Sequence, residues 1–282
     1  MTTMSAAAAG TIRLGDRTVK RLGYGAMRLT GPGVWGPPKD PANALAVLRR
    51  ALELGVTIID TSDAYGPETS ELQIAEALYP YPPELVIATK GGLTRPGPSQ
   101  WVPDCRPERL RACCEASLKR LRAEAIDLYQ LHAVDPKVPY AEQVGVLEDL
   151  RREGKIRLVG VCNVGVDELD VARSVAPIVS VQNRYNMTDR SSEDVLEICE
   201  REGLAFLPWF PLDAGDIGES APAQEIARAH GCSVYAVALA WLLKRSESML
   251  PIPGTSSIEH LEENVAAARL ELSDEEFRKL AA

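Results

Sequence analysis

The sequence predicts an α/β fold, a (β/α)8 TIM barrel, and two observations carry the prediction. Eight short apolar segments alternate with amphipathic helical patterns, and such strands belong to a parallel sheet covered by helices. The length of 282 residues suits one domain over residues 1–282, since such a barrel takes ~250 residues. A doubly wound sheet is the alternative, but residues 23–28 lack the third glycine of its GxGxxG turn and no helix follows.

The first elements are a tail and a hairpin. Residues 1–10 are rich in alanine, and we expect a flexible tail there. Residues 11–14 and 18–22 alternate in polarity around a compact turn at 15–17, which predicts a β-hairpin. In a barrel this hairpin would lie across the bottom, the N-terminal end.

Eight strand-and-helix units follow. The predicted strands are short apolar runs: 22–24, 56–60, 85–89, 126–131, 157–161, 178–181, 204–207 and 249–252. The predicted helices carry apolar residues at helical spacing: 41–54, 70–78, 107–121, 140–152, 166–175, 192–202, 224–230, 234–244 and 258–268. Pro107 occupies a first-turn position, and Ser273 with Glu276 has the spacing of a capping box near the end of the chain.

Composition excludes several classes of function. A net charge of -9 argues against nucleic acid, which needs clustered Lys and Arg. No run of ~18 apolar residues is present, so we expect no membrane span. The N-terminus has no basic region before an apolar core, so we expect a cytoplasmic protein. Six cysteines show no CxxC pair; the adjacent Cys113 and Cys114 are better explained as packing residues than as a redox site.

Four chemically active side chains follow consecutive predicted strands. Asp60 and Tyr65 follow the second strand, Lys90 the third and His132 the fourth, and these loops converge on one face of a barrel. A Lys ammonium favours the phenolate and lowers the pKa of a nearby Tyr, and a carboxylate keeps that Lys charged. A His beside the same oxygen can orient it. Each residue alone is as readily structural, but the ordered set predicts a general acid that protonates a developing alkoxide.

The chain resembles the aldo-keto reductase family, NADPH-dependent barrels that reduce aldehydes and ketones. The resemblance spans about residues 11–272 and rests on seven motifs in order at strand ends. They are Asp60-Thr61-Ser62-Asp63-Ala64-Tyr65-Gly66, Thr89-Lys90, Leu131-His132, Gly160-Val161-Cys162-Asn163, Val181-Gln182-Asn183, Pro208-Trp209-Phe210-Pro211-Leu212 and Ile252-Pro253-Gly254-Thr255-Ser256-Ser257. It implies that Tyr65 donates the proton, that Lys90 with Asp60 depresses its pKa, and that His132 orients the carbonyl.

The resemblance also implies a nicotinamide dinucleotide extended across the barrel mouth. Asn163 and Gln182 would bind the carboxamide beside Cys162, and Trp209 would stack on the nicotinamide. Further cofactor contacts would come from Gly25, Ala26, Met27, Asp60, Phe210, Pro211, Leu212, Gly254, Thr255, Ser256, Ser257, His260, Glu263 and Asn264. We expect a small-molecule carbonyl or alcohol as substrate, no metal, and a monomer or small homo-oligomer.

Some positions depart from the family pattern. Gly254 replaces a Lys, and His260 replaces an Arg, that many members place on the 2′-phosphate. Hydroxyls and backbone N–H groups at the start of the last predicted helix still offer a phosphate site. NADPH is therefore expected, with NADH left open. Phe210 and Cys162 each stand where Ser is common.

The substrate pocket and the rival functions are less sharply defined. Trp35, Leu93 and Trp101 are candidate pocket residues, although each is as readily a loop anchor, and Asp63 either lines the pocket or caps a turn, which we favour. One alternative function is a non-catalytic NADP(H)-binding regulatory subunit of the same fold. A metal-dependent hydrolase is the other, but three histidines do not supply its ligands.

Overall fold

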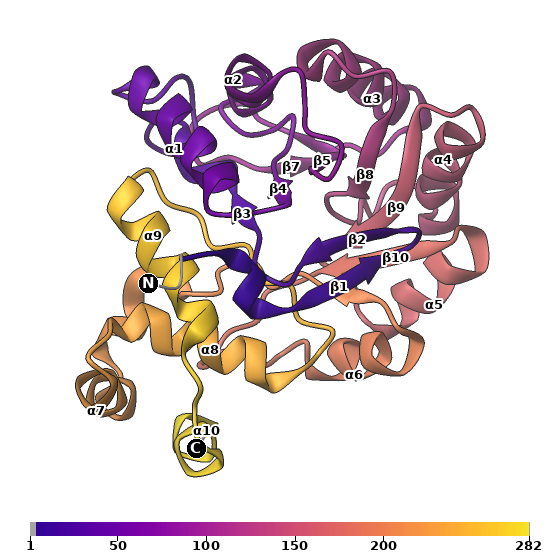
Figure 1. Ribbon diagram of the computed structural model, residues 1–282. Coiled ribbons are helices and arrows are strands. Elements are labelled where there is room, and N and C mark those ends of the chain that lie inside the picture. Colours follow the sequence, from indigo (N-terminus) through magenta and orange to yellow (C-terminus); the bar gives the residue numbers. More distant parts are fainter. Residues whose placement is uncertain (1–3, 282) are drawn as a thin grey trace.

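The protein folds as a curled parallel sheet surrounded by helices (Figure 1). The computed structural model describes residues 4–281, and the side chains of all of these except 214–216 and 281. Seven parallel strands pair in the order β11-β10-β9-β8-β5-β4-β3. Their bounds are β3 Tyr24–Gly25, β4 Ile58–Asp60, β5 Val86–Gly91, β8 Ile126–Leu131, β9 Ile156–Cys162, β10 Ile178–Gln182 and β11 Ala205–Phe206. The predicted (β/α)8 barrel is confirmed.

Residues 248–253 close the barrel in the place of the eighth strand. On one side they exchange two backbone hydrogen bonds of 2.8 Å with β11, and on the other they accept bonds from Gly23 and Gly25 at 2.9 and 3.2 Å. Pro251 and Pro253 have no N–H to return to β3, so this side of the ladder has acceptors only. The segment therefore joins both edges without forming a regular strand.

Helices cover the outside of the barrel close to their predicted positions. They are α1 Pro41–Glu53, α2 Thr69–Leu78, α3 Pro107–Leu121, α4 Tyr140–Arg152, α5 Val166–Val175, α6 Glu193–Glu202, α7 Ala221–His230, α8 Val234–Arg245, α9 Ile258–Ala266 and α10 Asp274–Ala281. Local chemistry sets the ends: α7 begins earlier than predicted because Ser220 caps it. The capping box is confirmed, with the Ser273 N–H on Glu276 and the Glu276 N–H on Ser273 at 2.7 and 3.2 Å.

Two hairpins lie at opposite ends of the barrel. The predicted one, β1 Thr11–Leu14 with β2 Arg17–Lys20, crosses the N-terminal end in front of the strands in Figure 1. Leu14 and Val19 of this hairpin pack on the buried residues inside the strands. A second, unpredicted hairpin, β6 Leu93–Thr94 with β7 Val102–Pro103, follows β5 at the other end. It brings Trp101 to the carboxyl ends of the strands.

The predicted flexible tail is wrong for its described part. Ala6–Ala9 forms a 3-10 helix that Ser5 caps, and Ala6 is fully buried. The Ala6 N–H donates to the Leu54 carbonyl oxygen at 2.8 Å. Small alanine side chains allow this close approach to the end of α1; residues 1–3 of the expected tail lie outside the described residues.

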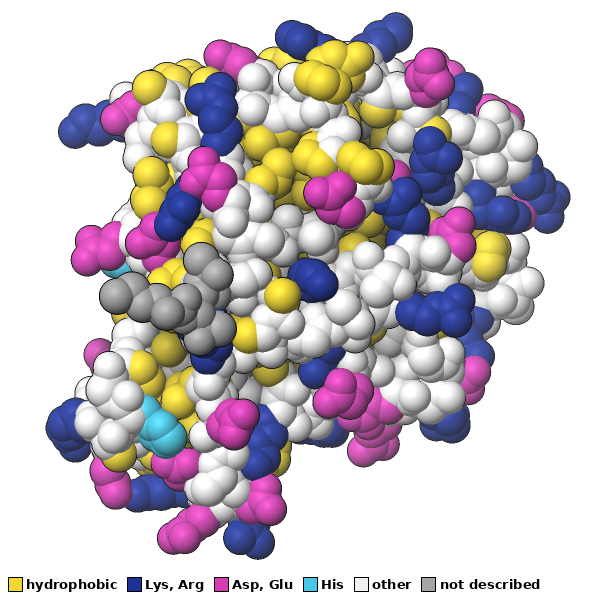
Figure 2. Space-filling model, in the orientation of Figure 1, with side chains coloured by type: hydrophobic (Ala, Val, Ile, Leu, Met, Phe, Trp, Pro, Cys, Tyr) yellow, Lys and Arg dark blue, Asp and Glu magenta, His cyan; other side chains and the backbone are white. Residues whose placement is uncertain are grey.

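The surface at the hairpin end carries mixed charge. Figure 2 shows basic and acidic side chains interspersed around this face, with apolar side chains between them. Within residues 4–281 no single helix is long and apolar enough to cross a membrane; the bent pair of α7 and α8 has the length and composition only when the two are taken together.

Candidate active site at the carboxyl ends of the strands

Asp60, Lys90 and Tyr65 form one buried cluster where β4 and β5 end. Lys90 Nζ donates to Asp60 Oδ1 at 2.6 Å and to the Tyr65 hydroxyl at 3.4 Å. It also donates to the Thr61 carbonyl oxygen at 2.8 Å. Lys90 is 0% exposed and Asp60 2%, so water does not compete for these bonds. The structure therefore brings together three of the four side chains selected from the sequence.

Neighbouring strands hold the Asp60 carboxylate in place. Its Oδ2 accepts hydrogen bonds from Gln182 Nε2 at 2.8 Å and from Gln130 Nε2 at 3.2 Å. Burial disfavours the charge on Lys90, but the adjacent Asp60 carboxylate more than compensates, and the pKa of Lys90 lies above its ordinary value. Lys90 is therefore a fixed cation beside the Tyr65 hydroxyl.

Tyr65 is a neutral phenol near neutral pH. Burial raises the pKa of Tyr65 to about 12, and the Lys90 ammonium offsets only part of that rise. Lys90 lowers the pKa of Tyr65, as predicted from the sequence, but burial raises it by more. The physical reason is that the free energy of removing a phenolate from water exceeds the stabilisation that the Lys90 ammonium provides at 3.4 Å.

His132 lies beside Tyr65 as a neutral ring. The two rings meet edge to face with centroids 5.9 Å apart. Burial, together with the charges of Lys90 and Arg95, holds the pKa of His132 well below its ordinary range. Its Nδ1 lies 3.0 Å from the Ser62 hydroxyl oxygen, and no hydrogen bond to Nε2 is found among residues 4–281. Nε2 is therefore the ring atom available to a ligand.

Aromatic side chains lie beside the Tyr65 ring. Trp101 contacts Tyr65 edge to face at 6.1 Å and lies 6.3 Å from the His132 ring. The Arg95 guanidinium covers Trp101 at 3.6 Å and Trp35 at 5.8 Å. Trp101 thus borders the cluster directly, and Trp35 joins it through Arg95.

Leu93 is a partly buried residue of the β6–β7 hairpin. It lines a cleft between the loop after β4 and helix α3, and none of the four predicted catalytic side chains lines that cleft. Its place therefore does not support the predicted role in substrate binding.

The predicted nicotinamide contacts converge on the same site. Trp209 Nε1 donates to Asn163 Oδ1 at 2.9 Å, and Asn163 Nδ2 donates to the His132 carbonyl oxygen at 2.9 Å. Each polar atom of the Asn163 amide keeps capacity for a second bond. Gln182 Nε2 is engaged with Asp60. Cys162 is buried, and burial raises the pKa of its thiol, so it is inert packing here.

The segment after β11 has an unusual backbone. Phe210 has a φ of 51°, a left-handed conformation that is uncommon for a bulky residue. The Asn186 side chain holds its carbonyl oxygen at 3.0 Å, and the Arg184 guanidinium lies 5.9 Å from its ring. These contacts fix Phe210 to Leu212 next to Trp209, where the pyrophosphate was predicted.

Close backbone approach explains the glycine at position 254. A Cβ on Gly254 would lie 2.6 Å from the Gly25 carbonyl oxygen, and one on Gly25 would lie 2.6 Å from the Ile252 carbonyl oxygen. Any side chain at Gly254 would displace the backbone in this conformation. The departure from Lys is therefore required by the way these two segments meet in this protein.

The adjoining residues present groups that fit a nucleotide phosphate. Ser257 caps α9, and its hydroxyl accepts the His260 N–H at 3.2 Å. The Thr255 carbonyl oxygen is held by the Tyr24 hydroxyl at 2.5 Å. Ser256, His260 and Glu263 are exposed, whereas Asn264 is buried. The exposed Ser256 and Gly254 beside the N-terminus of α9 suit an anionic group.

Three contributors were not selected from the sequence. Gln130 holds Asp60, Ser62 contacts His132, and Arg95 covers Trp101. Gln130 faces inward at the end of β8, a position that strand alternation alone could have suggested. The roles of Ser62 and Arg95 depend on loop conformations that have no sequence signature. Among residues 4–281, no group of three metal-ligating side chains is found.

The chain is similar in sequence and structure to known oxidoreductases. The model of the Aldo/keto reductase family matches residues 21–282. An uncharacterized oxidoreductase of Schizosaccharomyces pombe is 48% identical over 98% of this chain and 90% of its own length. A pyridoxine 4-dehydrogenase of Escherichia coli is 41% identical over 94% and 95%. A solved aldo-keto reductase from Klebsiella pneumoniae in complex with NADPH is 27% identical, with a TM-score of 0.82 over 96% of this chain and 93% of that one.

Proposed function

The chain belongs to the aldo/keto reductase family of oxidoreductases, and from this premise we propose that it transfers a hydride from NADPH to the carbonyl of an aldehyde or ketone. The observation that carries the proposal is the buried cluster itself. A neutral Tyr65 hydroxyl lies 3.4 Å from a fixed Lys90 ammonium, and the Tyr65 ring contacts Trp101 and His132.

Tyr65 is the general acid in this proposal. His132 is uncharged because its pKa is held far below its ordinary range, so it can donate a hydrogen bond but has no surplus proton. Tyr65 keeps its proton up to high pH, since burial raises its pKa to about 12. The Lys90 ammonium stabilises the phenolate that remains after the proton moves to the alkoxide.

The proposed cofactor contacts follow from the same geometry. The bound nicotinamide would supply the hydride. Trp209 and Asn163, already linked at 2.9 Å, would hold the ring, with Gln182 beside Asp60. The hydroxyls of residues 255–257 and the N-terminus of α9 would hold the adenosine end. Support for NADPH also comes from the NADPH complex of the Klebsiella pneumoniae relative.

A Tyr65→Phe variant tests the proposal. The wild-type protein is expected to oxidise NADPH in the presence of 4-nitrobenzaldehyde, and Tyr65→Phe to lose a factor of ~10²–10⁴ in kcat, as expected when a general acid is removed. NADPH binding, followed by quenching of tryptophan fluorescence, is expected to stay unchanged. Tyr79→Phe is the matched control because Tyr79 is a half-exposed surface residue.

Two results would overturn this function. Full turnover by Tyr65→Phe would remove the assigned acid. Tight NADPH binding by the wild type, without turnover on a broad set of carbonyl compounds, would instead favour the non-catalytic regulatory subunit.

A further inference from the structure

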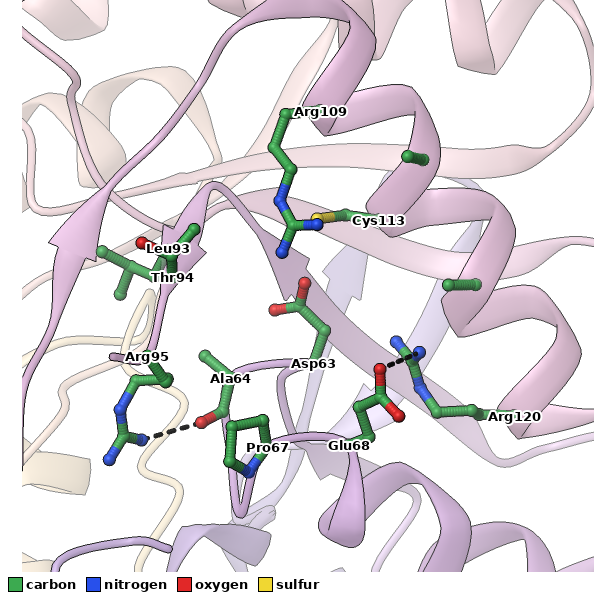
Figure 3. Close-up of a pocket in the computed structure, with 12 residues that line it drawn as sticks. Asp63, Ala64, Pro67, Glu68, Leu93, Thr94, Arg95, Arg109, Cys113 and Arg120 are labelled. Atoms are coloured by element: carbon green, nitrogen blue, oxygen red, sulfur yellow. Dashed lines mark hydrogen bonds and ion pairs between the residues drawn. The ribbon is translucent and has the colours of Figure 1, made fainter. Parts of the chain in front are cut away.

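A cleft lies behind the loop that carries Tyr65. It has a volume of about 90 Å³ and opens between the loop after β4, the strand β6 and the helix α3. Figure 3 shows the Asp63 carboxylate pointing into it, toward Cys113 and Arg109 of α3. The expected role of Asp63 as a turn cap is wrong, since among the described residues no backbone N–H donates to its side chain.

The Asp63 carboxylate is buried without an ion pair of its own in the described part of the chain. It is 8% exposed, and its hydrogen-bond partners are the Ser62 hydroxyl at 3.2 Å and the Cys113 thiol. The titratable and charged side chains near it or around the cleft are Glu68 and Glu71 of the α2 region, Arg95 after β6, Arg109, Cys113 and Arg120 of α3, and Tyr129 of β8. Arg120 is already paired with Glu68 and Glu71.

A short hydrogen-bond chain connects Asp63 to His132. The Ser62 hydroxyl oxygen lies 3.2 Å from Asp63 Oδ1 and 3.0 Å from His132 Nδ1. The Ala64 N–H donates to the same oxygen at 3.1 Å. A serine hydroxyl has one proton to donate and two lone pairs. It can therefore donate to Asp63 or to His132, but not to both.

We propose that Asp63 is a positioning residue that selects, through Ser62, which ring nitrogen of His132 carries the proton. An ionised Asp63 only accepts, so Ser62 donates to it and in turn accepts from His132 Nδ1–H, which leaves Nε2 without a proton. A protonated Asp63 donates to Ser62, Ser62 donates to Nδ1, and the His132 proton is on Nε2. The ring is neutral in both states, so the single proton taken up resides on Asp63.

The consequence for the site follows from Nε2 being the free ring atom. Only the Nε2–H form of His132 can donate to a carbonyl oxygen, and this step rests on the proposed function. Burial, reinforced by the Glu71 carboxylate, raises the pKa of Asp63 to about 6. The kcat for carbonyl reduction should therefore rise as the pH falls through the pKa of Asp63. His132 stays uncharged over this range because its own pKa is far lower.

Removing the Asp63 side chain leaves the loop supported by backbone bonds. The Asp63 N–H donates to the Lys90 carbonyl oxygen at 3.4 Å, and its carbonyl oxygen accepts from the Glu68 N–H at 2.7 Å. An Asp63→Ala variant therefore removes the carboxylate without removing these constraints. Glu68→Ala is the matched control, since Glu68 is a carboxylate on the same cleft whose side chain is 60% exposed.

The test reads the His132 tautomer directly by ¹⁵N NMR of the ring nitrogens. With only three histidines in the chain, His230→Gln and His260→Gln variants assign the His132 signals. We expect Nε2–H at about pH 5 and Nδ1–H at about pH 8 in the wild type and in Glu68→Ala, on either side of the Asp63 pKa. In Asp63→Ala we expect Nε2–H at both values, and the acid-side rise in kcat for reduction should disappear.

The outcomes separate this inference from the proposed function. A wild-type tautomer that does not change between these pH values, or an unchanged switch in Asp63→Ala, would overturn the inference even if carbonyl compounds are reduced. A tautomer switch that depends on Asp63, in a protein that reduces no carbonyl compound, would support the inference and overturn the proposed function alone.

Discussion

Replacing Asp60 by Asn should destabilise the fold far more than a surface substitution would. Lys90 is fully buried, and its strongest contact is the Asp60 carboxylate at 2.6 Å. In Asp60→Asn the neutral amide oxygen can accept from Lys90 only by turning its NH2 group toward the Gln130 and Gln182 donors. The ammonium otherwise keeps the Thr61 carbonyl oxygen and the Tyr65 hydroxyl. The negative charge that balances it is gone.

The structure sets the expected size of this effect. Breaking a buried ion pair by removing one partner costs ~3–5 kcal/mol, because an uncompensated buried charge remains. Lys90→Met should cost less, since Asp60 keeps the Gln130 and Gln182 amides as donors and can also take up a proton. The double variant Asp60→Asn/Lys90→Met leaves no charge at either position. Its loss of unfolding free energy should therefore be smaller than the sum of the two single-variant losses by ~2 kcal/mol or more.

Urea denaturation of the wild type, the two single variants and the double variant at one pH measures the coupling between Asp60 and Lys90. The unfolding free energies form a double-mutant cycle, and the slope of each transition shows whether the unfolded state has changed. Turnover measured on the same samples separates stability from catalysis, because the double variant should regain stability without regaining activity. Single losses that simply add would refute the assignment of Asp60 as the counter-ion of Lys90.

Three further predictions follow from the same geometry. Gly254→Ala should cost ~1–3 kcal/mol of unfolding free energy by overpacking, because its Cβ would lie 2.6 Å from the Gly25 carbonyl oxygen; the open helical position Gly145 should tolerate Ala. The rate of reduction should show no alkaline loss due to Tyr65 below about pH 10, since its pKa is raised to about 12, and a Tyr65-dependent loss near neutral pH would contradict this. Asp63→Asn should raise the free energy of unfolding at pH 7 by up to ~2 kcal/mol, because the raised pKa of about 6 makes the ionised carboxylate costly to bury. For the same reason the unfolding free energy of the wild type should increase as the pH falls from 7 toward 4. Equal unfolding free energies of the two proteins at pH 7 would contradict this prediction.

The sequence was sufficient for most of the fold because its signals are local. Ser273 and Glu276 form the predicted capping box, and Pro107 begins α3 as expected. Apolar strands alternating with helices admit few topologies, and the barrel among them places every strand end on one face. The order of Asp60, Lys90 and His132 along the chain therefore predicted their proximity without coordinates.

Other features depended on atoms that are distant in the sequence. A strand was predicted at 249–252, but the prolines at 251 and 253 leave this segment with acceptors only toward β3. Gly254 was interpreted as a missing phosphate ligand, whereas the Gly25 carbonyl oxygen leaves no room for a side chain there. Both outcomes come from which backbone lies opposite, and no local pattern encodes that.

The sequence alone determined the residue types of the site, a phenol, an ammonium, a carboxylate and an imidazole, and the barrel that gathers them. Only the tertiary structure decided their ionisation. Burial outweighs Lys90 at Tyr65, neutralises His132 and raises the pKa of Asp63 to about 6. These outcomes depend on how much water each group loses and on which charges face it across the fold, and that balance exists only once the chain is packed.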